Sequence, residues 1–145
     1  MTTLTPSISI SELRFVCTRA AVGAGTPFGF GEDFAETAIT LAKMGFDAVS
    51  VARPCLEGLA SQESSGVVEL RGVDGVMCFD AESRGVLSAI YAGPALCDHL
   101  IVNGMNSSAR LVCVDSPLLA VAGLAAVLTE AVSGLVSWQT DAGEK

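Results

Sequence analysis

The sequence predicts an α/β (or α+β) fold, in which an N-terminal helical layer, a β-hairpin and a C-terminal βαβαβ unit form one mixed sheet covered by helices. Three observations lead to this prediction. Apolar residues recur at helical spacing between residues 9 and 60, turn residues separate two short apolar runs near residue 74, and three later apolar runs alternate with helix-like segments. At 145 residues the chain has the size of one domain, so we expect residues 1–145 to fold as a single domain.

The first helix is predicted to begin at a capping box. Ser9 and Glu12 stand in the S-x-x-E spacing, in which the hydroxyl and the carboxylate bond free amides at a helix start. The apolar face that we expect to be buried carries Leu13, Val16, Cys17, Ala20 and Ala21. Gly23 and Gly25 then end the segment.

Two further helices are predicted before residue 61. One runs to Met44, where Gly45 stops it, and its buried stripe is Phe30, Phe34, Ala38 and Leu41. Its acidic residues, Glu32, Asp33 and Glu36, fall in the first turns, where the helix dipole favours negative charge. The other covers Asp47–Ala60, with Asp47 as its cap and Pro54 as a possible bend.

The hairpin and the C-terminal unit complete the fold. Val67–Leu70 and Val76–Phe79 are predicted to pair across Arg71–Gly75, where Gly72 and Asp74-Gly75 supply turn chemistry. The three later strands are predicted at Val86–Ala92, Ala109–Asp115 and Leu135–Gln139. A helix is expected to start at Pro94 and another at Pro117, because proline suits the first helical position. Crossover helices of this kind imply that the three strands run parallel.

The composition predicts a self-associating protein. Half of the residues are apolar, 17% are charged and the mean hydropathy is +0.54, which is more apolar than a lone monomer needs. We therefore expect a homo-oligomer. The uninterrupted apolar run Leu118–Leu128 is too short to span a bilayer, so we predict no membrane partner.

Charge and cysteine usage exclude other classes. The net charge is −8 and the eight basic residues are scattered, so we predict no nucleic-acid partner, and three acids at the start of the second helix disfavour a helix-turn-helix regulator. The five cysteines are odd in number and form no C-x-x-C pair, which predicts buried free thiols. With no secretory signal pattern at the start of the chain, we expect a cytoplasmic location.

One segment carries a family resemblance. The run from Arg19 to Gly29 reads R-A-A-V-G-A-G-T-P-F-G and leads into an acidic helix start at Glu32-Asp33. It resembles the R-A-A-x-G-A-G-x-P-x-G pattern of a family of small bacterial proteins known only as a domain of unknown function. Ala92–Asp98 and Val114–Ala120 are similar to later parts of that pattern. The resemblance implies no activity, substrate or catalytic residue.

A candidate pocket is predicted where open α/β sheets bind ligands, beyond the carboxyl ends of strands. The residues expected there are Gly93, Cys97, His99, Asp115 and Ser116. A thiol, a carboxylate and the only histidine could make an activated nucleophile. Against this, residues one and two apart on a helix do not face each other, which favours Cys97 in the core and His99 on a solvated face. Asp115 and Ser116 also suit the capping of a helix at Pro117.

Two other site hypotheses are weaker. The glycine-rich segment Gly23–Gly31 could cradle an anion, but a helix precedes it and Glu32 and Asp33 follow it, so we expect a structural turn. One histidine and dispersed cysteines offer no zinc-ligand spacing, and we predict no metal and no cofactor. The leading functional hypothesis is a non-enzymatic association or small-ligand-binding domain. The alternative is a small cytoplasmic enzyme with its site at the carboxyl ends of the C-terminal strands.

Overall fold

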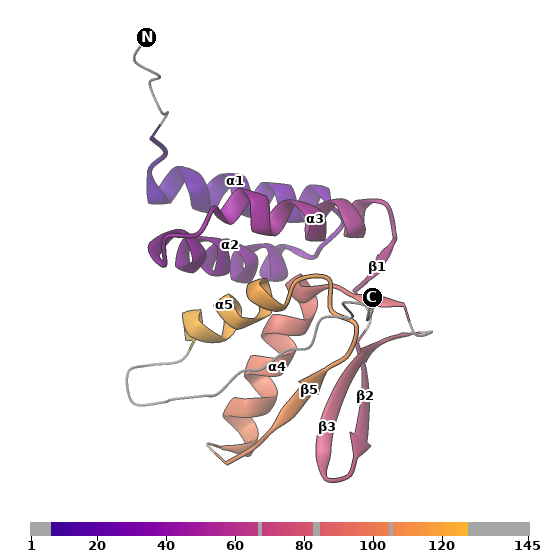
Figure 1. Cartoon of the computed structure of the whole chain (residues 1–145). Coiled ribbons are helices and arrows are strands. Elements are labelled where there is room, and N and C mark those ends of the chain that lie inside the picture. The colour runs from indigo at the N-terminus through magenta and orange to yellow at the C-terminus, as the bar shows by residue number, and fades with distance from the viewer. Residues whose placement is uncertain (1–6, 67, 83–84, 105, 128–145) are drawn as a thin grey trace, which may run out of the picture.

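The chain forms a layer of three helices beside a smaller arrangement of strands and two further helices (Figure 1). A computed structural model describes residues 7–66, 68–82, 85–104 and 106–127. The helical layer consists of α1 (Ile10–Gly23), α2 (Phe28–Lys43) and α3 (Ala48–Ala60). The predicted mixed α/β class, with helices first and a small mixed sheet after them, is confirmed.

The helix starts follow the sequence signals. At α1 the Glu12 N–H donates to Ser9 Oγ (3.2 Å) while the Ser9 N–H donates to Glu12 Oε2 (2.8 Å), so the predicted capping box is present. At α3 the Asp47 carboxylate accepts hydrogen bonds from the amides of Val49 and Ser50, and Pro54 lies inside the helix. The α2 helix ends at Lys43, and Gly45 after it has a φ of +84°, a conformation that glycine adopts without strain.

The buried stripe of α2 is confirmed, whereas the predicted face of α1 is largely wrong. Phe34, Ala38 and Leu41 are buried, and the half-buried Phe30 ring lies 4.6 Å from that of Tyr91 between centroids. On α1 only Ala21 of the predicted face is buried, with Leu13 and Cys17 half-buried and both Val16 and Ala20 exposed. The reason is that α1 packs chiefly on α2, which covers only one narrow side of it.

The hairpin pairs β2 (Val68–Val73) with β3 (Val76–Ala81) in antiparallel register. Its turn is shorter than the predicted Arg71–Gly75, because Asp74 (φ +50°) and Gly75 (φ +79°) alone reverse the chain. Positive φ at both central residues is the type I′ geometry that matches the twist of paired strands. Across the hairpin, the exposed guanidinium group of Arg71 forms an ion pair with the buried carboxylate of Asp80.

The remaining strands are short. β5 (Ala109–Leu111) pairs parallel with β3, and β1 (Ser64–Ser65) pairs parallel with β4 (Val86–Leu87). An isolated parallel bridge between Leu87 and Val114 joins β4 to the segment between β5 and α5 (Pro117–Val127). The strands β3 and β5 are therefore parallel and are connected through α4 (Ala89–Asn103). The predicted crossover joined Val86–Ala92 to Ala109–Asp115 instead, and the only strand pairing between those two segments, within the part of the chain that the structure describes, is the Leu87–Val114 bridge. The predicted strand Leu135–Gln139 lies outside the described residues.

Two predictions are wrong here: the strand Val86–Ala92 and the helix start at Pro94. Only Val86–Leu87 is strand, and α4 (Ala89–Asn103) begins immediately after Ser88, whose Oγ accepts from the Ile90 amide (3.4 Å). Ser88 is thus the effective cap, and Pro94 lies inside the helix. The other proline prediction is confirmed, because α5 (Pro117–Val127) starts at Pro117 and Ser116 Oγ accepts from the Leu119 amide (3.1 Å).

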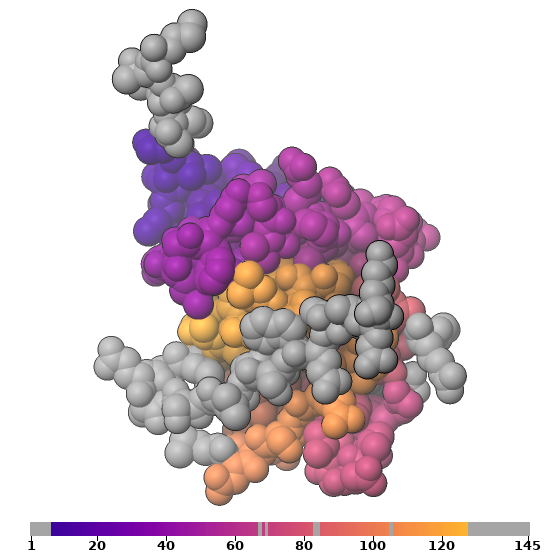
Figure 2. Space-filling view, viewed as in Figure 1, coloured from indigo at the N-terminus to yellow at the C-terminus, as the bar shows by residue number. Residues whose placement is uncertain are grey.

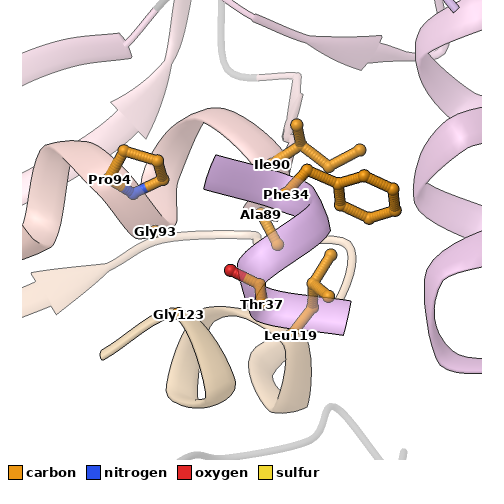
Figure 3. Close-up of a pocket in the computed structure, with 8 residues that line it drawn as sticks. All are labelled: Phe34, Thr37, Ala89, Ile90, Gly93, Pro94, Leu119 and Gly123. Carbon is orange, nitrogen blue, oxygen red and sulfur yellow. The ribbon is translucent and has the colours of Figure 1, made fainter. Parts of the chain in front are cut away.

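The helices α2, α4 and α5 meet in what we call the central junction, where α5 lies between the helical layer and α4 (Figure 1). Gly93 of α4 faces Gly123 of α5, since a Cβ on Gly123 would lie 3.8 Å from the Gly93 Cα. The close approach leaves a cavity of only about 10 Å³ (Figure 3). Its lining comes from all three helices: Phe34, Thr37, Ala89, Ile90, Gly93, Pro94, Leu119 and Gly123. This space is about the minimum for a single water molecule, so the junction is packed core.

Candidate functional site

The predicted pocket residue Asp115 joins three segments of the chain. Its Oδ1 accepts a hydrogen bond from the Ala89 amide in the first turn of α4 (2.8 Å) and another from the Cys55 thiol of α3 (3.3 Å). The Asp115 amide in turn donates to the Leu87 carbonyl of β4 (3.0 Å). Asp115 therefore satisfies a helix amide that would otherwise have no partner, and it holds α3, α4 and the segment before α5 together.

Ser116 and Gly93 also have structural contacts. Ser116 Oγ caps α5, as one of the two sequence interpretations expected. Gly93 lies in the central junction against α5, where the missing side chain lets the two helices approach. The second carboxylate oxygen of Asp115, Oδ2, is buried and accepts no hydrogen bond from any residue that the structure describes.

The thiols near these residues are held protonated. Burial, followed by the charge of Asp115, raises the pKa of the Cys55 thiol far above its ordinary value. Burial, with the Asp98 and Asp33 carboxylates adding to it, raises the pKa of Cys97 to about 11. Cys97 is 5% exposed and its Sγ lies 3.7 Å from the Gly123 carbonyl oxygen of α5. A nucleophilic cysteine needs the opposite environment, one that lowers the thiol pKa.

All five cysteines are free thiols, as predicted, but they are not all buried. Cys55, Cys78 and Cys97 are buried, Cys17 is half-buried and Cys113 is exposed. Cys113 has a φ of +49° in the connection between β5 and α5, where the chain leaves the sheet and its side chain reaches solvent.

His99 lies on another side of α4. Its ring makes an edge contact with Phe79 of β3, with centroids 5.5 Å apart, and Asn103 Nδ2 lies 3.2 Å from its Nδ1. The described contacts thus place the five predicted residues at three locations: Gly93 and Cys97 at the α4–α5 contact, Asp115 and Ser116 at the start of α5, and His99 beside the hairpin.

His99 belongs to a groove between α4 and the hairpin that the sequence analysis did not predict. The groove has a volume of about 410 Å³. Its apolar lining comes from both elements, with polar groups on the helix: Val68, Leu70, Phe79, Ala95, Asp98, His99, Val102 and Asn103. Val102 is 82% exposed and Leu70 is 58% exposed, so the groove is open to solvent along its length.

A second unpredicted feature is the outer face of α1, formed by Glu12, Phe15, Val16, Arg19 and Val22. Phe15 is 66% exposed and Val16 is 53% exposed. In the space-filling view the indigo surface of α1 lies at the edge of the molecule farthest from the hairpin (Figure 2). The signal for this face was present in the sequence, because Phe15 and Val22 are seven residues apart and lie across the helix from Leu13, Cys17 and Ala21.

Two further findings concern metals and membranes. Within the described ranges, no three His, Cys, Asp or Glu side chains are grouped so that they could hold a metal ion. Among the helices of the described part of the chain, none combines the length and the apolarity needed to cross a bilayer.

The comparisons with known proteins identify the family but not an activity. The family model described as "Protein of unknown function (DUF3726)" matches residues 8–85, which is more than half of the chain. The chain belongs to the DUF3726 family. The match covers the helical layer and the hairpin, including the glycine-rich segment on which the resemblance rested. A search of curated proteins and a search of solved structures each found no match.

Proposed function

We propose that this DUF3726 protein is an association domain that binds a second copy of itself through the outer face of α1. The observation that carries the proposal is the exposure of Phe15 (66%) and Val16 (53%) on a helix whose opposite side is packed against α2. Large apolar side chains grouped on one exposed helix face are typical of an interaction surface. The apolar composition of the whole chain supports the same interpretation.

The thiol environments favour association over thiol-based catalysis. The raised pKa of Cys97, about 11, keeps that thiol protonated near neutral pH. The free thiols are in keeping with a reducing, cytoplasmic setting, in which the association would take place.

The test is the concentration dependence of mass. We expect sedimentation velocity and light scattering to show a reversible dimer of the full chain between about 1 and 200 μM. Replacing both Phe15 and Val16 by serine should shift the chain to monomer without changing its melting temperature by more than a few degrees. Leu70→Ser is the matched control, because Leu70 is 58% exposed on the hairpin, away from α1. A wild-type chain that stays monomeric over this range would overturn the proposal.

The groove between α4 and the hairpin supports a second candidate, the binding of a small ligand with an apolar body and a hydrogen-bonding group. Its volume of about 410 Å³ lies in the range of ligand pockets, and His99 and Asn103 place polar atoms beside the apolar Val102. A screen of fragments by NMR should shift amide signals of β2 and α4 in the wild type and not in Val102→Glu. Shifts that are equal in both proteins, or absent from these two elements, would argue against a ligand in this groove.

A further inference from the structure

The outer face of α1 carries opposite charges at a spacing that suits a copy of itself. Glu12 and Arg19 are seven residues apart, which is two helical turns, so they lie on one line along the helix. Phe15 and Val16 lie midway between them and flank that line on either side. From its N-terminal to its C-terminal end, the face therefore carries an acidic residue, then two apolar residues, and then a basic residue.

The two charges are available for a partner. The other arginine of α1, Arg14, points toward α2, where its Nε donates to Glu36 Oε1 (2.6 Å). Arg19 is exposed and makes no ion pair with any residue that the structure describes. Glu12 uses Oε2 to bond the Ser9 amide, and this hydrogen bonding lowers the pKa of Glu12 and favours its ionised form.

We infer that two copies of the chain associate through an antiparallel pair of α1 helices, with the two-fold axis passing between Phe15 and Val16. This inference rests on the proposed function and specifies its geometry. Rotation about that axis places Phe15 against Phe15, Val16 against Val16, and Glu12 of each copy opposite Arg19 of the other. A parallel pair would instead set Glu12 against Glu12 and Arg19 against Arg19.

Electrostatics make this arrangement selective. With a net charge of −8, two copies repel each other over most of their surfaces. The antiparallel pair forms two symmetry-related attractions at a face that also carries exposed apolar groups, so it opposes the general repulsion locally. Isologous contacts of this type repeat every interaction twice, which also doubles the penalty of any wrong charge.

Two charge-reversed variants of the full chain test the geometry. Arg19→Glu presents acids at positions 12 and 19, and Glu12→Lys presents bases at both, so each variant alone would repel itself in the antiparallel pair. We expect each to dimerise at least about tenfold more weakly than the wild type by sedimentation equilibrium. An equimolar mixture should form a heterodimer about as tight as the wild-type dimer, because every reversed charge then meets its opposite. Arg110→Glu on the exposed side of β5 changes the net charge as Arg19→Glu does, and it should leave dimerisation within about threefold.

The outcomes separate the inference from the proposed function. If the wild type dimerises and both variants dimerise equally well alone, the antiparallel pair is wrong while self-association stands. If the wild type is monomeric, the antiparallel pair and the proposed self-association are both wrong. Because Glu12→Lys also removes the capping carboxylate, circular dichroism melts accompany each measurement, and Arg19→Glu with Glu12→Gln provides a second variant. That double variant removes the repulsion between acids, so it should dimerise more tightly than Arg19→Glu alone, and failure to do so would overturn the pairing of positions 12 and 19.

Discussion

The central junction and α1 are built from similar apolar residues but differ in how many sides are covered. In the junction, α5 packs against both α2 and α4, and Leu119, Ala120 and Ala122 are almost completely buried. On α1 the packing against α2 covers one side, and Phe15, Val16 and Val22 remain exposed. The difference shows that the apolar residues of this chain are divided between a closely packed interior and an exposed helix face, which is the face that our proposal assigns to a second copy of the chain.

Truncating an apolar side chain should lower the free energy of unfolding strongly in the central junction and hardly at all on the outer face of α1. Leu119 is 1% exposed, so Leu119→Ala is expected to lower the free energy of unfolding by about 2–5 kcal/mol through lost burial and a residual cavity. Phe15 is 66% exposed, so Phe15→Ala should change the free energy of unfolding by less than about 0.5 kcal/mol at a concentration where the chain is monomeric. Urea denaturation of both variants measures the contrast. Equal losses would mean that α1 is as enclosed as the junction.

The sequence predicted the elements well where local chemistry decides them. The capping box at Ser9, the Asp47 cap and the start at Pro117 are each set by residues within one turn, and all three are present. The start of α4 was misplaced because Pro94 is a common first-turn residue, while Ser88, six residues earlier, caps the helix. Leu87 and Ala89–Ala92 form one apolar run, so hydropathy alone does not show where strand becomes helix.

The second prediction concerns the polar link that holds the junction in place. Asp115→Ala removes the acceptor of the Ala89 amide and of the Cys55 thiol, and we expect a loss of about 1–3 kcal/mol because a partly buried amide is left without a partner. Asp115→Asn retains an oxygen at the Oδ1 position and should lose about half as much. Thermal and urea unfolding of both variants checks this order. A more severe effect from asparagine than from alanine would show that Asp115 does not act through the Ala89 amide.

Most of the candidate site could not be predicted, because its contacts join distant parts of the chain. Cys55 and Asp115 are 60 residues apart, and no spacing rule connects a helix thiol to a carboxylate that follows a strand. The grouping of His99 with Phe79 required the packing of α4 on β3, which depends on where α4 begins. The capping role of Ser116 was predictable because it depends only on the residues that follow it.

The third prediction tests how much α1 depends on its own cap. Because α1 is covered on one side only, local interactions carry a larger share of its stability than they do for α5. Ser9→Ala removes the hydroxyl that accepts from the Glu12 amide and should cost about 1 kcal/mol. Ser11→Ala is the matched control, since Ser11 is exposed and lies outside the capping box. Hydrogen exchange should show faster opening of α1 in Ser9→Ala alone, and unchanged protection would indicate that packing on α2 suffices.

The last prediction is a pH dependence of stability that arises from a buried thiol in the central junction. Burial raises the pKa of Cys97 to about 11 from an ordinary value of 9.0, so the folded state favours the neutral thiol. Its contribution to stability is therefore fully present below pH 9 and is lost as the pH rises from about 9 to 11, because only the unfolded chain ionises easily in that window. Cys97→Ala should flatten the decline measured by urea unfolding at pH 8, 9 and 10, whereas Cys113→Ala, at an exposed position, should not. Alkylation followed by mass spectrometry gives an independent check, because the exposed Cys113 should react at pH 8 while the buried Cys97 stays protected. Rapid modification of Cys97 at that pH would mean that the α4–α5 contact opens far more readily than its packing implies.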